Sequence, residues 1–194
     1  MDNILNILTD EEKAFIKHHG IEPSDIYDAR GENSTQFYKN AKRNDCHYVI
    51  HSCFCGFRLK DRHNHCLKCN PASVAFVKRE IDKGVVYVAY SGKYTKVGMV
   101  ENNINSVAIA LNKREYRLNS EGGYGGREGW QTIKSWKLEK DAGKVEREAQ
   151  AILKKYNVKE DYTYSGNKRN AKEVFECPVQ TAIDAVKKAI EMNK

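Results

Sequence analysis

The chain has 194 residues, of which 40% are hydrophobic and 30% are charged, and its formal net charge is +7. This composition is typical of a globular protein, and the chain contains no apolar run long enough to cross a bilayer. The first residues, MDNILNILTDEEK, are acidic and lack a signal-peptide pattern, so we expect a cytoplasmic protein with no membrane partner.

Charge is distributed unevenly along the chain. Residues 1–38 carry 3 basic and 8 acidic side chains, whereas residues 39–83 carry 10 basic and 4 acidic ones, and the remainder is again basic. A basic body behind an acidic head favours a polyanionic partner, most simply nucleic acid. The alternative is a solvated, lysine-rich surface.

Residues 1–45 are predicted to form a helical N-terminal segment. LTDEEKAFIKHHG has Thr9 as an N-cap, acidic residues in the first turn and Gly20 as the stop. PSDIYDA and STQFYKNAKR indicate two more short helices.

Residues 46–83 are predicted to form a Cys/His zinc knuckle followed by a connecting helix, PASVAFVKREIDKG, that Gly84 ends. Four of the six cysteines lie within 17 residues of each other: Cys53, Cys55, Cys66 and Cys69. In a cytoplasmic protein such a cluster favours a metal over disulfides, and two pairs of thiolates predict a closed, structural Zn²⁺ site. A reduced, metal-free set of thiols is the alternative.

The spacing within this segment leaves one zinc ligand open. Cys66 and Cys69 have the usual two-residue separation, but Cys53 and Cys55 are one residue closer. A histidine could therefore replace one thiolate, and the candidates are His51, His63 and His65. The same loop carries four basic residues that could contact a phosphate backbone: Arg58, Lys60, Arg62 and Lys68.

The remaining residues, 84–194, are predicted to alternate strands and helices. VVYVAYSGKYTKVGMV reads as two strands joined by a polar turn. After it we expect, in chain order, a helix over 106–119, the loop GGYGGREGW, a strand in WQTIKSWKLEK and a helix in KDAGKVEREAQAILKKY. A polar stretch, EDYTYSGNKRN, leads to a short strand around 174–177 and a last helix that Pro178 opens.

Two of these helices carry charges beside their apolar faces. In the helix over 106–119, Arg114 falls in the middle of the apolar face and Arg117 at its edge. A buried arginine needs an anion, which is either a structural carboxylate or a phosphate. In the helix over 144–156, Glu146 and Glu148 flank the apolar face about equally, so periodicity does not choose between them.

Together these residues resemble the GIY-YIG nuclease superfamily. Val85-Val86-Tyr87, a short turn and Lys96-Val97-Gly98 precede an arginine on one helix and a glutamate on the next, over roughly residues 84–177. The match is to the branch in which lysine replaces the second-motif tyrosine. HCLKCNPASVAFVKREIDKGVVYVA and YGGREGW resemble segments of a bacterial and phage-type group that carries an upstream Cys/His zinc knuckle.

The resemblance implies an α/β (α+β) fold with a small central antiparallel sheet flanked by helices. It implies hydrolysis of DNA phosphodiesters with one divalent cation, Mg²⁺ or Mn²⁺. Residue by residue, it implies catalytic roles for Tyr87, Lys96, Arg114 and Glu146, with Glu146 holding the cation. Arg117 and Glu148 remain alternatives for the last two, and the family's terminal asparagine has no clear match, Asn167 and Asn170 being candidates.

We therefore expect a metal-dependent DNA endonuclease. In this interpretation Glu146 places the cation, Arg114 stabilises the phosphoryl charge, and Tyr87 and Lys96 assist the attacking water. Tyr124 and Trp130 of the GGYGGREGW loop could stack on a base or simply anchor the loop. The alternatives are a non-catalytic nucleic-acid-binding protein that kept the fold, and a zinc-stabilised protein-interaction domain.

Overall fold

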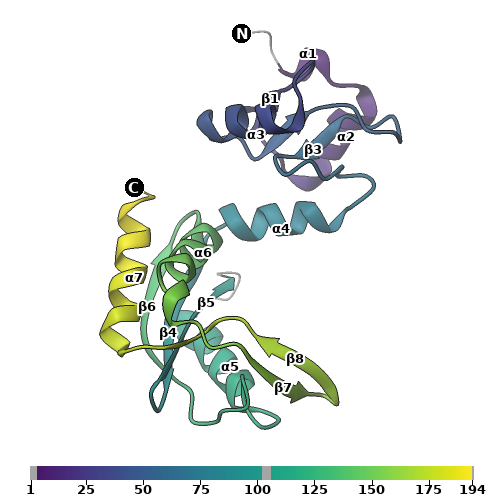
Figure 1. Cartoon of the computed structure of the whole chain (residues 1–194). Helices are drawn as coiled ribbons and strands as arrows, with labels where there is room; N and C mark the ends of the chain where they lie inside the picture. Colours follow the sequence, from purple (N-terminus) through teal and green to yellow (C-terminus); the bar gives the residue numbers. More distant parts are fainter. Residues whose placement is uncertain (1–3, 102–105, 194) are drawn as a thin grey trace. The chain divides into compact units, whose positions relative to one another are not determined.

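The structure, a computed structural model, describes residues 4–101 and 106–193 (Figure 1). The chain packs into two compact units, Met1–Lys78 and Arg79–Lys194. Helices and sheets are mixed in both, so the predicted α+β class is confirmed. No helix within the described ranges is long and apolar enough to span a membrane.

The N-terminal unit packs short helices around a three-stranded sheet. The helices are α1 (Ile4–Ile7), α2 (Asp10–His19) and α3 (Ser34–Arg43), and the strands are β1 (Ile26–Asp28), β2 (Tyr48–Ile50) and β3 (Leu59–Asp61). Strand β1 pairs parallel with β2, and β2 pairs antiparallel with β3. The predicted caps of α2 are present: Thr9 forms a capping box with Glu12, and Gly20 adopts a left-handed conformation with φ of 60°.

One predicted helix of this unit is wrong. PSDIYDA forms a 3₁₀ turn, Pro23–Asp25, followed by β1, because Ile26–Asp28 pair with the buried strand β2. The intrinsic helix propensity of a seven-residue segment is weak, and pairing with β2 outweighs it. The division of the sequence into 1–45, 46–83 and 84–194 stays a prediction; in the structure, residues on both sides of position 45 belong to the same unit.

The C-terminal unit is built on a four-stranded antiparallel sheet of order β6-β4-β5-β9. Its strands are β4 (Gly84–Ser91), β5 (Tyr94–Glu101), β6 (Gln131–Leu138) and β9 (Val174–Glu176). The helices are α5 (Val107–Asn119), α6 (Ala142–Ile152) and α7 (Val179–Glu191), and the C-terminal part of α4 (Ala72–Ile81) also belongs to this unit. The predicted small central sheet flanked by helices is therefore present.

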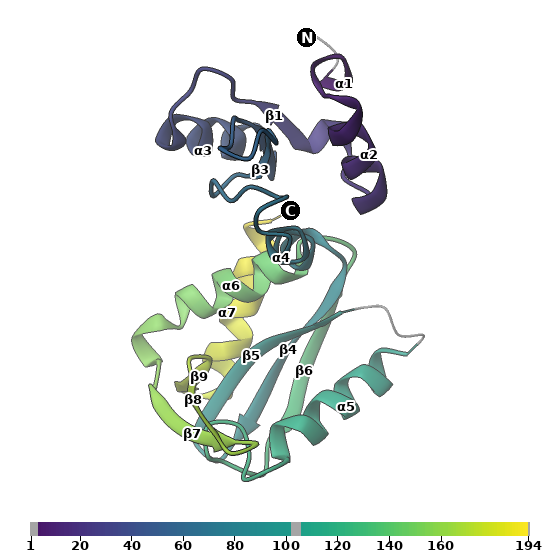
Figure 2. The ribbon, with the colours of Figure 1, turned by 90° about the vertical axis from the view of Figure 1, so that its right-hand side faces the viewer.

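The central strand β4 is buried on both faces, as its continuous apolar run predicts. Val86 and Val88 pack with α6 and α7 on one face. Tyr87 and Ala89 lie on the other face, which α5 and the GGYGGREGW loop cover. Figure 2 shows the sheet between α6 and α7 on one side and α5 on the other.

A hairpin occupies the polar stretch EDYTYSGNKRN, for which no strand is predicted from the sequence. Strands β7 (Glu160–Tyr164) and β8 (Asn167–Ala171) pair antiparallel around a two-residue turn. Ser165 and Gly166 both have positive φ, 50° and 75°, which is the conformation that such a tight turn requires. A Ser-Gly pair between alternating residues is the pattern that could have predicted it.

The end of α4 is fixed to the start of α6 by close packing and ion pairs. A Cβ on Gly143 would lie 2.3 Å from the carbonyl oxygen of Arg79, so only glycine fits where the two helices meet. Arg147 donates two hydrogen bonds to Glu80, at 2.8 and 2.7 Å. Residue 79 is therefore held beside α6.

A second close contact lies at the centre of the sheet. Gly98 of β5 is directly opposite Tyr87 of β4, and a Cβ at residue 98 would lie 2.5 Å from the Tyr87 hydroxyl. The hydroxyl end of the Tyr87 ring therefore lies against the glycine. This explains in physical terms why a glycine follows Lys96-Val97.

We predict that Gly98→Ala lowers the free energy of unfolding of the C-terminal unit by about 1–3 kcal/mol, because the added methyl group overpacks a buried contact. Thermal or denaturant unfolding measures the change. The matched control is Ser135→Ala. Ser135 lies on β6, where it pairs with Tyr87 from the other neighbouring strand, and this substitution only removes a half-buried hydroxyl. Equal stability of Gly98→Ala and the control would contradict this account of the contact.

Candidate active site

The first pair of candidate residues meets on the α5 face of the sheet. Helix α5 buries Ala110 and Leu118 and directs Arg114 between them toward β4. The Arg114 Nε donates a hydrogen bond of 2.9 Å to the Tyr87 hydroxyl oxygen. Burial alone would lower the pKa of Arg114, but the Tyr87 oxygen and the charges of Glu173 and Glu146 raise it overall. Arg117 makes no such contact and lines a cavity together with Arg114.

Helix α6 distinguishes the two candidate glutamates by their surroundings. Glu146 is 7% exposed and accepts a hydrogen bond of 3.2 Å from Arg79. Glu148 instead accepts a hydrogen bond from Asn193, beyond the end of α7. Of the two carboxylates, Glu146 is the one whose electrostatic neighbours include Lys96 and Glu173.

Lys96 is fully buried, with an exposed fraction of 0%. Its ammonium group forms an ion pair with Glu173, a residue that sequence analysis did not single out. The same ammonium lies 4.5 Å from the centre of the Tyr124 ring, in a cation–π arrangement. The Tyr124 hydroxyl donates to the same Glu173 carboxylate at 3.5 Å.

The register of the sheet explains how these groups from its two faces come together. Strand β9 pairs with β5 only along Tyr94–Lys96. Beyond that point the outer edge of β5 has no paired strand among the described residues, and Gln150 of α6 donates to the carbonyl oxygen of Val97 instead. A residue of α6 can therefore reach round the open edge toward the α5 face. Glu173, immediately before β9, lies at the same break.

The two carboxylates at this break influence each other's protonation. Burial, and then the negative charge of Glu173, raise the pKa of Glu146 above its ordinary value against the opposing charges of Arg79 and Lys96. Burial also acts to raise the pKa of Glu173, but the charge and hydrogen bond of Lys96 lower it overall. Relative to an ordinary carboxylate, Glu173 therefore favours its ionised form and Glu146 favours its protonated form.

Sequence analysis missed two residues of this cluster, Arg79 and Glu173. Arg79 belongs to the Lys-Arg ending of α4, and only the packing of α4 against α6 brings it to Glu146. Glu173 lies between the short strands β8 and β9, in a segment too short to show a hydrophobic periodicity. The two asparagines considered for the family's last position lie on β8, where Asn170 donates to Asp161 and Asn167 donates to Ser165.

The four clustered cysteines come together in the N-terminal unit, with every pair of sulfur atoms within 4.8 Å. The Sγ atoms of Cys53 and Cys69 are 3.9 Å apart, and those of Cys55 and Cys66 are 3.6 Å apart. A tetrahedral zinc ion with Zn–S bonds of about 2.3 Å requires sulfurs about 3.8 Å apart. The cluster is therefore compatible with structural zinc.

The histidines considered as replacement ligands have other contacts. His51 contacts the carbonyl oxygen of Glu32 at 3.0 Å and the Lys60 ammonium at 3.3 Å. His65 contacts Asp61 at 2.9 Å, and the ring of His63 packs against Tyr38. The cluster of ligand atoms among the described residues contains the four thiols and no histidine.

The basic residues of the knuckle differ in how much they present to solvent. The Arg58 guanidinium donates to the buried carboxylate of Glu12, and Lys60 donates to Asn64 at 2.8 Å from a buried position. Arg62 is 8% exposed. Lys68 keeps half of its side chain exposed and pairs with exposed Glu11. Of the four, Lys68 is thus the most accessible to a phosphate.

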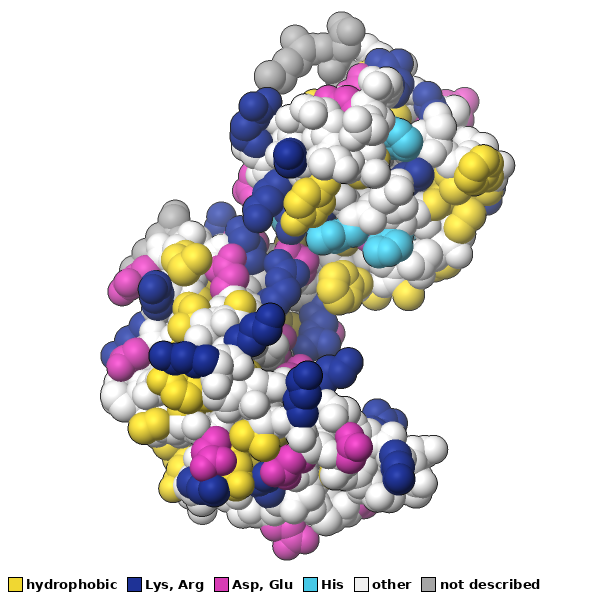
Figure 3. Space-filling view, in the orientation of Figure 1, with side chains coloured by type: hydrophobic (Ala, Val, Ile, Leu, Met, Phe, Trp, Pro, Cys, Tyr) yellow, Lys and Arg dark blue, Asp and Glu magenta, His cyan; other side chains and the backbone are white. Residues whose placement is uncertain are grey.

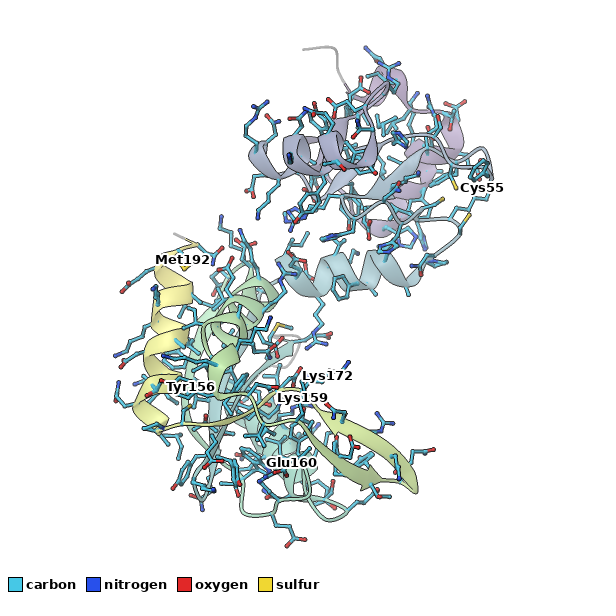
Figure 4. The ribbon with its side chains drawn as sticks, in the orientation of Figure 1. Cys55, Tyr156, Lys159, Glu160, Lys172 and Met192 are labelled. Atoms are coloured by element: carbon cyan, nitrogen blue, oxygen red, sulfur yellow. The ribbon has the colours of Figure 1, made fainter. Side chains whose placement is uncertain are left out.

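The aromatic residues of the GGYGGREGW loop pack against the core of the C-terminal unit rather than extending into solvent. Trp130 is 1% exposed, and its Nε1 donates to the Tyr124 carbonyl oxygen at 3.1 Å. Arg127 of the same loop lies over the Tyr94 ring and pairs with Glu160, which Figure 4 labels at the start of β7. This geometry fits the loop-anchor interpretation of Trp130, whereas Tyr124 is half-buried beside Lys96 and Glu173.

Comparison with protein families identifies a domain in the C-terminal part of the chain. A model of the T5orf172 domain matches residues 84–190, which include Tyr87, Lys96, Arg114, Glu146 and Glu173. This domain shares the GIY-YIG-like, nuclease-associated fold family, and there is no direct match to a GIY-YIG model. Curated proteins and solved structures give no match.

The geometry of the four thiols predicts one zinc ion per chain and loss of that ion in Cys55→Ser, because a three-thiolate site is incomplete. Metal analysis of the purified protein measures the zinc content, and thermal unfolding with and without a chelator measures the associated stability. Cys46→Ser, at a buried cysteine outside the cluster, is the control and should retain the metal. Equal zinc content in the two variants would contradict the assignment.

Proposed function

We propose that this protein, which belongs to the T5orf172 domain family, is a metal-dependent DNA endonuclease. The observation that carries the proposal is the hydrogen bond from Arg114 Nε to the Tyr87 hydroxyl, made over Gly98 beside the buried carboxylate of Glu146. A fixed cation, a phenol and a carboxylate from three elements are the groups that phosphodiester hydrolysis uses.

In the proposed reaction, a water oxygen attacks the phosphorus atom and the bond from phosphorus to the leaving sugar oxygen breaks. Tyr87 enters the proposed step as a phenolate that the Arg114 Nε–H group stabilises, and it accepts the proton of the attacking water to become the phenol. The leaving oxygen takes up a proton from solvent, and Tyr87 afterwards returns its proton to solvent. Arg114 supports both events. Its guanidinium stabilises negative charge on the tyrosine oxygen, and its remaining N–H groups face the developing charge on the phosphoryl oxygens.

Glu146 is the residue that we propose to hold a divalent cation such as Mg²⁺ or Mn²⁺. The chemistry of the site fits this choice, because a carboxylate oxygen is the ligand that these hard cations prefer and because burial and Glu173 leave Glu146 in need of positive charge. When bound, the cation would act as a Lewis acid on the phosphate and lower the pKa of its own water. The Arg79 guanidinium, which donates a hydrogen bond of 3.2 Å to the Glu146 carboxylate, orients that carboxylate.

Lys96 is proposed as a positioning residue and not as a group that touches DNA. It is completely buried, and its ammonium is committed to Glu173 and the Tyr124 ring. In this role Lys96 fixes the second carboxylate of the site and neutralises part of its charge. Glu173 then lies next to Glu146 without repelling the phosphate as strongly as a free carboxylate would.

We predict that Glu146→Gln and Arg114→Ala each reduce DNA cleavage by at least about a hundredfold, because each removes charge that the transition state needs. A cleavage assay with Mg²⁺ on single-stranded, double-stranded and branched DNA measures this, with circular dichroism to verify folding. Glu148→Gln, on the same helix but bonded to Asn193, is the matched control and should cleave as the wild type does.

The outcomes of this assay separate the possible functions. Cleavage by Glu146→Gln at the wild-type rate would show that the active site is assigned to the wrong residues. Salt-dependent DNA binding by the wild type, without cleavage in any divalent metal, would favour a non-catalytic nucleic-acid-binding protein. Failure to bind any nucleic acid at low salt would indicate a protein-interaction domain.

For Lys96→Met we expect two changes. The free energy of unfolding should fall by about 1.5–3 kcal/mol, because Glu173, a third of whose side chain is exposed, loses its charged hydrogen-bond partner, and Glu173→Gln in the same chain should restore part of that loss. The Mg²⁺ concentration for half-maximal cleavage should also change, since the charge beside Glu146 changes. A purely structural role of Lys96 would leave the Mg²⁺ titration of the remaining folded enzyme unaltered, which contradicts our assignment.

A further inference from the structure

A basic cavity of about 420 Å³ lies next to the candidate active site, in the C-terminal unit. Helix α5 forms one wall, and the end of β5 and Arg79 form the rest. Its lining residues are Arg79, Met99, Val100, Glu101, Ala110, Lys113, Arg114 and Arg117. The cavity has the size of a small-molecule site, for which volumes of roughly 300–1,000 Å³ are usual.

The charges of the cavity are mostly positive. Four cationic side chains and one carboxylate, that of Glu101, line it. Arg79 is paired with Glu146, and Arg114 donates its Nε to Tyr87. In the part of the chain that the structure describes, Lys113 and Arg117 form no ion pair. On the visible face of the C-terminal unit, Figure 3 likewise shows Lys and Arg side chains close to one another.

The spacing of Lys113 and Arg117 is unfavourable for the helix itself. The two residues are four positions apart on α5, where like charges lie on the same face one turn from each other and repel. An anion between them removes that repulsion. Both side chains are also exposed, so an incoming ligand reaches them without unfolding any part of the helix.

Two lining residues connect the cavity to the site where we place the chemistry. Arg114 lines the cavity and contacts Tyr87, and Arg79 lines the cavity and contacts Glu146. A phosphate held at the site would therefore have the cavity as its immediate neighbour. Along a nucleic-acid strand the next phosphate follows within one nucleotide, a rise of roughly 3.4 Å in duplex DNA.

We propose that this cavity binds the phosphodiester adjacent to the one that is cut, with Lys113 and Arg117 as its phosphate contacts. The apolar part of the lining, Met99, Val100 and Ala110, suits the carbon face of the intervening sugar. The inference rests on the proposed function and extends it. It makes the substrate a polynucleotide strand and excludes a single nucleotide, and it gives Arg117 a role different from that of Arg114.

The test measures DNA binding in a cleavage-deficient Glu146→Gln chain as a function of salt. Each lost phosphate contact lowers the slope of log K against log salt by about 0.9 for duplex DNA and about 0.7 for single strands. Lys113→Gln with Arg117→Gln should therefore lower the slope by about 1.8 or 1.4. Lys134→Gln and Lys188→Gln, lysines of β6 and α7 that lie outside the cavity, should each leave it unchanged.

A second arm uses the cleaving enzyme. Lys113→Gln with Arg117→Gln should raise KM and leave kcat near the wild-type value, because a contact to a non-reacting phosphate is made equally in the ground and transition states. An unchanged salt slope and unchanged KM, with normal cleavage by the wild type, would overturn the cavity proposal and leave the nuclease proposal intact. Absence of cleavage by the wild type would overturn the nuclease proposal, and the binding arm would still test the cavity.

A third arm distinguishes a strand phosphate from a free one. Inorganic phosphate and thymidine monophosphate are titrated into the full chain by calorimetry. Weak binding, with dissociation constants above about 1 mM (a binding free energy smaller than about 4 kcal/mol), is expected for these probes. Tight binding that disappears in Lys113→Gln with Arg117→Gln, with no change in the DNA salt slope, would show that the cavity takes a free phosphate and would overturn the proposal.

Discussion

The close approach of Tyr87 to Gly98 is the constraint on which the candidate site depends. Because residue 98 has no side chain, the tyrosine ring lies over the neighbouring strand and its hydroxyl reaches Arg114 of α5. That hydrogen bond connects the central strand to the helix that covers this face of the sheet. A larger residue at 98 would move the phenol, and the guanidinium would lose the partner that offsets its burial. The absence of a side chain at residue 98 thus permits the hydrogen bond between Tyr87 of β4 and Arg114 of α5.

A second constraint is the length of β9. This strand pairs with β5 over only three residues, so the edge of the sheet opens where Lys96 ends the pairing. Groups from opposite faces meet there: Glu146 from α6, Glu173 from the segment before β9 and Lys96 from β5. A longer β9 would extend the regular ladder and cover this opening. The cluster of charges is therefore a consequence of an incomplete sheet, and each of its carboxylates is paired with one cation, Glu146 with Arg79 and Glu173 with Lys96.

The elements of the C-terminal unit were largely predictable, because their patterns are local. The run from Val85 to Tyr90 predicts a strand buried on both faces, and the apolar stripe of α5 directs Arg114 toward the sheet. In contrast, β1 and the β7–β8 hairpin come from short stretches with weak hydrophobic patterns. Strand β1 pairs with β2, which lies further along the chain, and the strands of the hairpin are mostly polar. For the site, the sequence spacing does not distinguish Glu146 from Glu148. The packing of α6 against α4 brings Arg79 to Glu146, and its packing against α7 brings Asn193 to Glu148. Arg79 and Glu173 were missed because neither lies in a periodic pattern that points to the others.

The burial of Lys96 changes how the lysine of the second motif should be understood. A lysine on the strand beside Tyr87 invites the interpretation that it meets a substrate directly. Here its ammonium is enclosed by Glu173 and the face of Tyr124, so any effect on the chemistry passes through those two groups. An ion pair in such surroundings costs desolvation energy that apolar residues of similar size would avoid. The ion pair holds the charged carboxylate of Glu173 against the Lys96 ammonium and among the electrostatic neighbours of Glu146, which an apolar residue at position 96 could not do.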